Sequence, residues 1–437
     1  MNVEAAVEAA HRTEWARVLS VVVRLTRDID LAQDAAQDAF ASALEIWQRD
    51  GTPDNPGAWL TTTARNRAID QLRRRQALAR RLPLLIVEHE CDSSPALEQS
   101  VITDDRLRLV FTCCHPALSL EARVALTLRL VCGLVTSDIA RLFLVSESTM
   151  AARITRAKRK IASAGIAYRV PDSDDLPQRL TGVLAVIFLV YTEGHTAAES
   201  DTLSRPGLTQ RSLELANTLI NLMPAESEAL GLAALLNLTE ARGGARLDAQ
   251  GQMVLLEHQD RSTWNRDLIE RGLDLVQRSL RSRRGRSPGP YAIQAAIAAV
   301  HAEAASYDET DWSQIAALYG ALFFVNPSPV VAVGRAVALG MATTPKAGLD
   351  ALETMAFDPH LKNHALVPAV RADLLRRCGR YADAADAYRD ALRLTSNGVV
   401  QAFLNRRITE MRQALNHCHP TITPPVPDVP GPPGSRR

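Results

Sequence analysis

The stretch TSDIARLFLVSESTMAARITRAKRKI, residues 136–161, contains two short helical patterns separated by a few residues. Thr136 is placed to cap the first helix and Ser146 to cap the second. Val145 and Met150 are spaced as a hydrophobic staple across the first turn of the second helix. The inward side of the first helix carries Ile139, Ala140 and Phe143. Two capped helices at this spacing predict a helix-turn-helix.

The second helix of this stretch has two different faces. Its apolar face follows helical spacing through Met150, Ile154, Ala157 and Ile161. Its opposite face presents Ser148, Thr149, Ala152, Arg153, Arg156, Arg159 and Lys160. A DNA major groove admits such a helix, whose early residues meet base edges while the basic side chains contact phosphates. A charged face alone is typical of a solvated helix, but a charged face within a helix-turn-helix favours binding of duplex DNA.

The composition limits where nucleic acid can bind. The chain has 437 residues, with 50 basic and 49 acidic side chains, and its formal net charge of +1 excludes a strong overall field. Basic surface must therefore be local. Residues 65–81 hold seven arginines against one aspartate, and residues 122–165 hold eight basic against two acidic side chains, so each window carries +6.

The whole chain is predicted to be all-α, because helical spacing recurs nearly everywhere and strand-like alternation does not persist. This length predicts several domains. We expect a helical block at 10–81, a linker at 82–103, the helix-turn-helix block at 104–165, a helical extension at 178–281, helical repeats at 288–417 and a proline-rich, disordered tail at 418–437. We also expect the extension to contact the first two blocks.

The lack of recognisable targeting signals and the small number of cysteines predict a cytoplasmic protein that does not bind membranes. The acidic N-terminus lacks the features of a signal peptide. The longest apolar run, VLAVIFLVY at 183–191, is about half the length that spans a bilayer. Six cysteines in this length suit a reducing compartment.

The C-terminal part carries an internal repeat. GRYADAADAYRDALRLTS and DWSQIAALYGALFFVNP share apolar and small residues at the same offsets, counted from Tyr381 and from Trp312. These offsets are those of the second helix of a tetratricopeptide (TPR) repeat, and Ala372 and Leu375 ahead of Gly379 agree with its first helix. Such helix pairs stack into a concave surface. Two interpretations remain, a plain scaffold or a surface that binds a peptide or protein ligand.

The first block contains a two-faced helix, LAQDAAQDAFASALEIW at 31–47. Phe40, Leu44 and Trp47 share one face and indicate core. Another face carries an acidic and amide stripe, formed by Asp34, Gln37, Asp38 and Ala41. The stripe is either solvated or docks on a basic partner.

The following helix contains WLTTTARNRAIDQLRRR, residues 59–75. Asn55 is placed to cap it, and Pro56 takes its first position. Its buried side is predicted to hold Leu60, Ala64, Ala68 and Leu72. The other side aligns Trp59, Thr62, Thr63, Asn66, Asp70 and Arg73. Stacking, hydrogen bonding and phosphate attraction on one line are what an exposed single strand requires.

Together these motifs resemble the sigma-70 family. DAAQDAF followed by AWLTTTARNRAIDQLRRR resembles its region 2, and LEARVALTLRL with the helix-turn-helix resembles its region 4. The absence of a region 3 between them is typical of extracytoplasmic-function (ECF) sigma factors. FTCCHPAL at 111–118, YTEGHTA at 191–197 and the repeats resemble an ECF subgroup with a large TPR-like extension.

The resemblance implies a role for each matching residue. Core RNA polymerase would be bound by Asp34, Gln37, Asp38 and Phe40. The melted promoter strand would be bound by Trp59, Arg65, Asn66, Arg67, Asp70, Arg73 and Arg74. The upstream duplex element would be bound by Ser148, Thr149, Ala152, Arg153, Arg156, Arg159 and Lys160.

Two other clusters suggest chemistry. Cys113, Cys114 and His115, together with upstream His89 and Cys91, resemble a zinc site, but vicinal cysteines fit a tetrahedral site poorly and buried thiols near a helix start are favoured. Glu193 and His195 resemble an acid and base pair, but no nucleophile or phosphate motif accompanies them, so a polar junction is favoured. We therefore expect no metal, no cofactor and no catalytic residues.

Two functions remain for the whole chain. The first is a sigma factor that binds core polymerase and promoter DNA, with its extension regulating it in cis. The alternative is a stand-alone helix-turn-helix regulator with a TPR-like sensor. Only the sigma factor needs both the acidic stripe and the strand-binding face of the first block, and both are present.

Overall fold

The structure is a computed structural model that describes residues 3–81, 105–143, 145–172, 174–197, 202–282, 287–354 and 365–418. Within these ranges the regular elements are helices, apart from one isolated bridge between Leu247 and Met253, so the predicted all-α class is confirmed. The predicted linker at 82–103 and the tail from 419 onward lie outside the described residues. No helix in the described part has the length and apolarity to cross a bilayer.

The described helices fall into two compact units, and each contains discontinuous pieces of chain. Unit 1 consists of Met1–Thr196, Ser204–Glu240 and Asp267–Ala295. Unit 2 consists of Ala197–Leu203, Ala241–Arg266 and Ala296–Arg437. The helical extension predicted at 178–281 is therefore divided between them, with most of its helices in unit 1.

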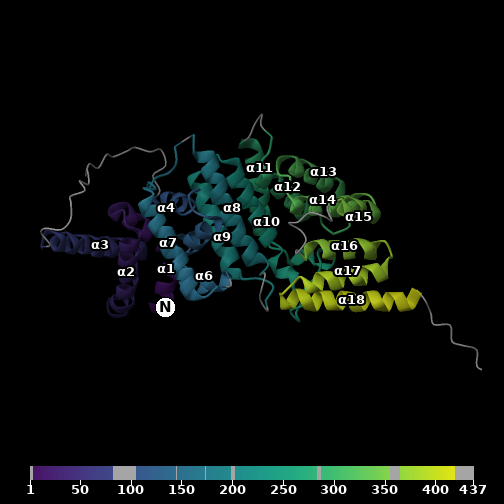
Figure 1. The fold of residues 1–437 in the computed structure, drawn as a ribbon, viewed down its shortest axis with the longest axis horizontal. Coiled ribbons are helices and arrows are strands. Elements are labelled where there is room, and N and C mark those ends of the chain that lie inside the picture. Colours follow the sequence, from purple (N-terminus) through teal and green to yellow (C-terminus); the bar gives the residue numbers. More distant parts are fainter. Residues whose placement is uncertain are drawn as a thin grey trace, which may run out of the picture. The chain divides into compact units, whose positions relative to one another are not determined.

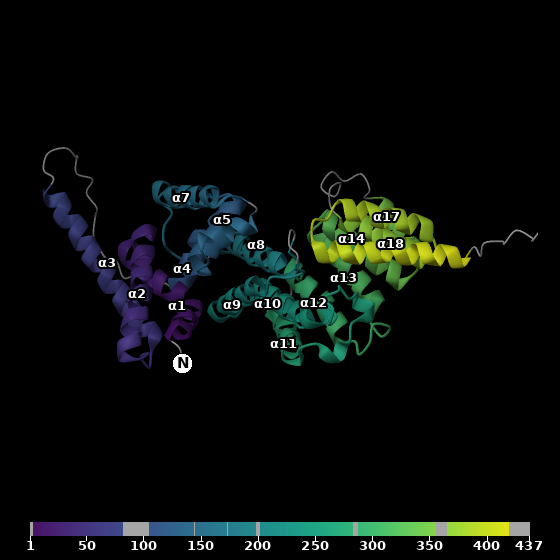
Figure 2. The same ribbon diagram turned by 90° about the horizontal axis from the view of Figure 1, so that it is seen from below.

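Unit 1 begins with three helices that pack on one another: α1 (Val3–Thr26), α2 (Ile29–Asp50) and α3 (Pro56–Arg81). Asp28 caps α2, because its carboxylate accepts hydrogen bonds from the N–H groups of Asp30 and Leu31 at 2.9 and 3.0 Å. Trp15 of α1 and Trp47 of α2 are buried in this core. The C-terminal part of α3 continues past α1 and α2 (Figure 2).

The second part of unit 1 contains five short elements: α4 (Asp105–Cys113), α5 (Leu120–Leu126), the π-helical turn η1 (Thr127–Val131), α6 (Thr136–Leu142) and α7 (Glu147–Ser163). It packs on the first three helices through α1. The indole N–H of Trp15 donates to the carbonyl of Leu130 at 3.1 Å, and Tyr168 donates to the carbonyl of Ser20 at 3.0 Å. Gly133, at φ +71°, lets the chain approach Trp15, because a Cβ there would lie 3.0 Å from the indole ring.

The rest of unit 1 is formed by α8 (Leu176–His195), α9 (Pro206–Leu222), α10 (Ser227–Glu240), α11 (Arg266–Ser282) and the start of α12 (Pro290–Glu303). These helices contact both preceding parts, as predicted. Arg179 of α8 donates to the carbonyl of Phe111 at 2.9 Å, and Arg211 of α9 donates to the carbonyl of Arg12 at 2.8 Å. Gly231 allows α10 to approach α12, since its Cβ would lie 2.6 Å from the backbone nitrogen of Ala292.

Unit 2 contains six further helices that stack side by side (Figure 1): α13 (Trp312–Val325), α14 (Pro329–Ala342), α15 (Pro345–Glu353), α16 (Leu366–Arg377), α17 (Tyr381–Arg393) and α18 (Gly398–Cys418). The turn between α16 and α17 depends on Gly379, whose φ of +73° suits glycine. The repeat positions Ala372, Leu375, Ala384 and Tyr388 are buried in one cluster. The periodicity therefore identified a real helical hairpin.

Unit 2 also includes the segment between α10 and α11, which contains the 3₁₀ turns η2 (Gly243–Arg246), η3 (Leu256–His258) and η4 (Arg261–Thr263). Glu257 of this segment accepts hydrogen bonds from Arg376 at 3.4 Å and from Arg377 at 2.6 Å. The Arg406 guanidinium donates to the carbonyl of Met253 at 2.9 Å. An irregular segment is thus held to α16 and α18 by charged hydrogen bonds.

Candidate nucleic-acid interface

Helix α3 separates buried from exposed side chains as its sequence predicts. The Asn55 side chain accepts a hydrogen bond from the N–H of Ala58 at 3.0 Å, and Pro56 is the first helical residue. Leu60, Ala64 and Ala68 are fully buried against α1 and α2. This buried side fixes the rotation of the helix, so the opposite side must face outward.

The outward side of α3 presents one aromatic ring followed by polar and basic groups. Trp59 is half-buried, and its ring meets the buried Trp47 ring edge-on at 5.6 Å between centroids. The exposed residues that continue this side are Arg65, Asn66, Arg67, Asp70, Arg73 and Arg74. The predicted strand-binding residues therefore lie on one helix and are accessible to a ligand.

The arginines of α3 have few internal partners, and those are local. Arg67 lies 3.4 Å from the Ser42 hydroxyl, and Arg73 lies 4.0 Å from Asp70. Arg75, which was not among the predicted contacts, pairs with Asp28 at 2.9 Å. Partial burial of Asp28 acts to raise its pKa, but hydrogen bonds from the Leu31 N–H and from Arg75 outweigh it and lower that pKa.

Helix α7 is also oriented by a buried face. Met150, Ile154, Ala157 and Ile161 are buried, as predicted. The Ser146 hydroxyl accepts from the N–H of Thr149 at 3.2 Å and so caps the helix, as predicted. The exposed residues of the opposite face are Ser148, Thr149, Ala152, Arg156, Arg159 and Lys160.

The predicted cap of the preceding helix is wrong. Helix α6 starts at Thr136, but the residue before it, Val135, occupies the cap position and makes no side-chain hydrogen bond. Thr136 is thus the first helical residue. The buried Ile139 and Ala140 hold α6 in place instead.

The acidic stripe of α2 is exposed. Asp34, Gln37, Asp38 and Ala41 all face solvent. They alternate with buried alanines, which pack α2 against α1 and α3.

Comparisons with known proteins agree with this geometry. Family models of sigma-70 region 2 and sigma-70 region 4 match residues 12–78 and 108–161, and a family of unknown function (DUF6596) matches residues 179–280. An uncharacterised protein of Rhizobium meliloti, R00370, is 40% identical over 400 residues, which cover 90% of this chain and 93% of that protein.

Relatives that are named as ECF sigma factors match about a third of the chain. The ECF RNA polymerase sigma factor SigK of Mycobacterium ulcerans is 29% identical over 147 residues, covering 33% of this chain and 76% of that protein. SigK of Mycobacterium tuberculosis is 28% identical over 149 residues, covering 33% and 78%. The chain belongs to the sigma-70 family. It is an ECF-type sigma factor for transcription initiation, with a C-terminal extension.

This membership weighs against the stand-alone regulator. Such a regulator needs a helix-turn-helix alone, whereas this chain also matches sigma-70 region 2 over residues 12–78. Sigma factors are not enzymes, and their family implies core RNA polymerase and promoter DNA as partners.

Phe40 of the sigma factor does not share the exposure of the stripe beside it. Its side chain is 7% exposed, and its ring lies 5.1 Å from His11 and 5.8 Å from Trp15. The prediction that Phe40 is core is therefore confirmed. Its contact with the polymerase stays a prediction. Leu44, predicted as core, is instead 43% exposed.

Two basic residues of α7 make internal contacts that sequence reasoning missed. Arg153 lies 3.4 Å from Glu121 and 5.3 Å from the centre of the Phe143 ring. Lys158 donates to Asp30 and to Gln33 of α2, each at 2.7 Å. Both contacts join residues that are far apart in sequence, so no local pattern indicates them.

Three cysteines of the sigma factor form part of its core. Cys113, Cys114 and Cys132 are buried free thiols. Burial raises the pKa of Cys114 to about 11 and that of Cys132 to about 12. Cys113 and Cys114 lie at the end of α4 instead of near a helix start. In the described residues no group of three metal-binding side chains comes together, and His89 and Cys91 lie outside them.

Glu193 and His195 belong to a polar junction between α8 and neighbouring helices, as favoured above. Glu193 pairs with Arg205 at 3.0 Å. The His195 ring stacks on Tyr191, whose hydroxyl donates to Glu240 at 3.1 Å. Each group has a structural role in joining α8, α9 and α10.

Proposed function

We propose that α3 binds the melted promoter strand through its outward side. Trp59 would stack on an unpaired base, Asn66 would hydrogen-bond to base edges, and the exposed arginines would attract phosphates. The main support for this proposal is that these polar and basic residues are exposed on the side of α3 opposite the fully buried Leu60, Ala64 and Ala68. Because this buried side fixes the rotation of the helix, the opposite side would be preorganised for its ligand, which reduces the entropy lost on binding.

We propose that the exposed stripe of Asp34, Gln37 and Asp38 docks on core RNA polymerase. Two carboxylates and an amide on one helix face suit a basic partner surface. The buried Phe40 would contribute by fixing the rotation of α2.

For α7, we propose contact with the upstream promoter element. Ser148, Thr149 and Ala152 lie near the helix start, where side chains reach base edges in the major groove. Arg153 and Arg156 would extend this contact. Arg159 and Lys160, further along the exposed face, would contact phosphates.

These roles define the proposed boundaries. Region 2 would extend over 10–81, region 4 over 104–165, the family-specific extension over 178–281, and the TPR-like repeats over 288–417. The repeats would bind a peptide or protein ligand, which the stacked hairpins of unit 2 support.

The extension would regulate the sigma factor in cis. Support comes from Arg211, which reaches region 2 at Arg12, and from Arg179, which reaches region 4 at Phe111. Arg211→Ala should therefore change transcript yield, with Arg271→Ala as the control, since Arg271 contacts only Asn217 of the same extension at 2.8 Å among its hydrogen bonds in the described part. Equal yields from both variants would argue against regulation through this contact.

Run-off transcription tests the main assignment. The full chain added to bacterial core polymerase on a genomic template library should give discrete start sites, and Asp34→Lys with Asp38→Lys should abolish binding to core. Failure of the unaltered chain to bind core would overturn the proposal.

A further inference from the structure

A groove of about 1150 Å³ lies between region 2 and region 4, within unit 1. Its lining comes from the end of α1, the start of α2, from α4, from the last turns of α7 and from the segment 165–172 that follows α7. Three apolar side chains line part of it, the buried Ile161 and the half-buried Ile29 and Val170. Pockets for small molecules have volumes of about 300–1,000 Å³. The groove therefore has room for a ligand with both a charged and an apolar part.

The groove is strongly basic. Its charged lining residues and their ion-pair partners comprise seven cations and four carboxylates, namely Arg24, Arg27, Arg75, Arg108, Lys158, Arg159 and Arg169 against Asp28, Asp30, Asp105 and Asp172. Three positive charges therefore remain when every one of these carboxylates is matched. Arg24 and Arg108 share the Asp105 carboxylate, at 3.4 and 3.8 Å. Arg27 and Arg159 have exposed side chains without an ion-pair partner in the described part of the chain.

Arg27 has a backbone conformation that is typical of glycine. It directly follows α1 with a φ of +51°, and no other non-glycine residue in the described ranges has a positive φ. Its N–H donates to the Val23 carbonyl at 2.8 Å, which ends α1 as a C-terminal glycine usually does. Arginine is less stable than glycine in this conformation, and such strain is found where a side chain has a function. The position of the Arg27 guanidinium at the groove supplies such a function.

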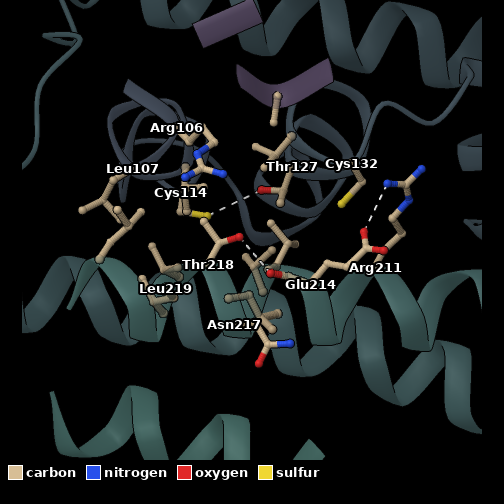
Figure 3. Close-up of a pocket in the computed structure, with 18 of the residues that line it drawn as sticks. Arg106, Leu107, Cys114, Thr127, Cys132, Arg211, Glu214, Asn217, Thr218 and Leu219 are labelled. Carbon is tan, nitrogen blue, oxygen red and sulfur yellow. Dashed lines mark hydrogen bonds and ion pairs between the residues drawn. The ribbon is translucent and has the colours of Figure 1, made fainter. Parts of the chain in front are cut away.

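The cavity of about 350 Å³ between α1, α4, α8 and α9 offers a comparison (Figure 3). Figure 3 shows Arg211 beside Glu214, with which it pairs at 3.2 Å. An anion that approached Arg211 would compete with this carboxylate. At Arg27 and Arg159 of the groove, an anion meets no competing carboxylate from the described part of the chain.

We propose that the groove binds a small ligand with adjacent phosphate groups, such as a nucleoside triphosphate. The phosphates would pair with Arg27, with Arg159 and with the two arginines that share one carboxylate. The base would lie against Ile29, Ile161 and Val170. Because the cations come from α1, α4 and α7, they surround a compact ligand, whereas duplex DNA is contacted along one helix face.

The ligand would affect the sigma factor in two ways. Since the groove walls come from region 2 and region 4, binding stabilises the packed form of the two. Arg159 also belongs to the proposed duplex-binding face of α7, so ligand and promoter phosphates compete for it. Binding of the ligand itself does not depend on the proposed DNA contacts.

Isothermal titration calorimetry of the purified full chain tests the ligand class. Without added magnesium, ATP should bind at one site per chain, and inorganic triphosphate should compete with it. Adenosine, which lacks the phosphates, should bind at least about 100-fold more weakly, because charged hydrogen bonds to two arginines are lost. Equal binding of ATP and adenosine, or no binding of ATP and triphosphate, would overturn the proposal.

Variants of the two arginines locate the site. Arg27→Gly should weaken ATP binding about tenfold without lowering the melting temperature, because glycine adopts a positive φ without strain. Arg27→Lys keeps the charge and should retain most of the affinity. Arg159→Gln should also weaken ATP about tenfold, whereas Arg156→Gln, on the same helix but outside the groove, should bind ATP normally. Normal ATP affinity in both Arg27→Gly and Arg159→Gln would refute the site.

Binding of duplex DNA distinguishes a free ligand from the promoter backbone as the source of the phosphates. Fluorescence anisotropy with a short random-sequence duplex should give the same affinity for Arg27→Gly as for the unaltered chain. Equal losses of duplex affinity and ATP affinity in Arg27→Gly would assign the groove to the DNA backbone and overturn the proposal.

Discussion

The two helices that are proposed to bind DNA, α3 and α7, differ in their contacts with the rest of unit 1. Among the described side chains of α3, arginines contact Ser42, Asp70 and Asp28 of region 2. In α7, Lys158 instead crosses to Asp30 of region 2, and Arg153 pairs with Glu121. The proposed strand-binding residues of α3 are thus exposed, while α7 is joined to region 2 through Lys158 beside its exposed basic face. Two helices in windows of equal net charge can thus differ in how many of their basic side chains are already engaged inside the protein.

The largest effect is expected from removing the proposed strand-binding side chains of α3. Trp59→Ala combined with Asn66→Ala should reduce promoter opening by about 10- to 100-fold, because stacking contributes about 1–3 kcal/mol per base. Permanganate reactivity of the melted strand measures this. Asp54→Ala, an exposed change just before α3, serves as the control. Equal losses in opening and in duplex binding by region 4 would contradict the separation of roles.

A second change loosens region 4 from region 2. Trp15→Phe removes the donor to the Leu130 carbonyl and leaves that buried acceptor without its partner. We expect the free energy of unfolding to fall by about 2 kcal/mol in urea titrations. Trp59→Phe is the matched control, since Trp59 is only half-buried, and it should cost under about 1 kcal/mol. Similar losses in the two variants would show that the inter-region hydrogen bond contributes little.

A smaller effect on stability is expected from breaking the ion pair between Lys158 of α7 and Asp30. Lys158 is 12% exposed but its partner Asp30 is 68% exposed, so solvent screens the pair. A double-mutant cycle with Lys158→Gln and Asp30→Asn should give a coupling energy of about 0.2–1 kcal/mol. The corresponding cycle for the α3 pair, Asp70 and Arg73, should give less, because that pair is 4.0 Å apart. A coupling above about 2 kcal/mol would mean that α7 is firmly locked to region 2.

The smallest effect depends on pH. Burial, together with Arg211 and Arg129, lowers the pKa of His11, which packs beside Trp15 and Phe40. In the unfolded chain the His11 imidazole takes up a proton below about pH 6.5, whereas in the folded chain it does so only at a lower pH. The free energy of unfolding is therefore highest above about pH 6.5 and falls as the pH drops toward the pKa of the folded state. Urea unfolding between pH 7.5 and 5 should show the decline.

His11→Gln should flatten this pH dependence. His301 of unit 2 also has a lowered pKa, of about 4, through burial, so His301→Gln serves as the comparison. If only His301→Gln flattened the curve, the region 2 junction would not be responsible.

Local sequence patterns predicted helices and their faces well. The caps at Asn55 and Ser146 and the buried side of α7 follow from spacing of a few residues, and the structure contains all of them. Contacts between distant residues could not be predicted in this way. Trp15 and Leu130 are 115 positions apart, and periodicity carries no information about that distance.

The errors have a similar origin. Leu44 has helical core spacing, but no element in the described part of the chain covers it enough to bury it, and it remains 43% exposed. Phe40, on the same predicted face, is buried as expected, because His11 and Trp15 pack against it. Which side of a helix meets a second element is a tertiary property that one helix does not specify.

The pairing of Glu257 with Arg376 and Arg377 sets an order of events during synthesis. The glutamate precedes its partners by 119 and 120 residues. At a ribosomal rate of about 5–20 residues per second, it waits for roughly 6 to 24 seconds before they emerge. Unit 1 ends at Ala295 and has its whole chain by then. Unit 1 can therefore fold first, while Glu257 stays without these two arginines until α16 is made. Arg261 of the same segment finds its partners earlier, at the carbonyls of His301 and Ala304.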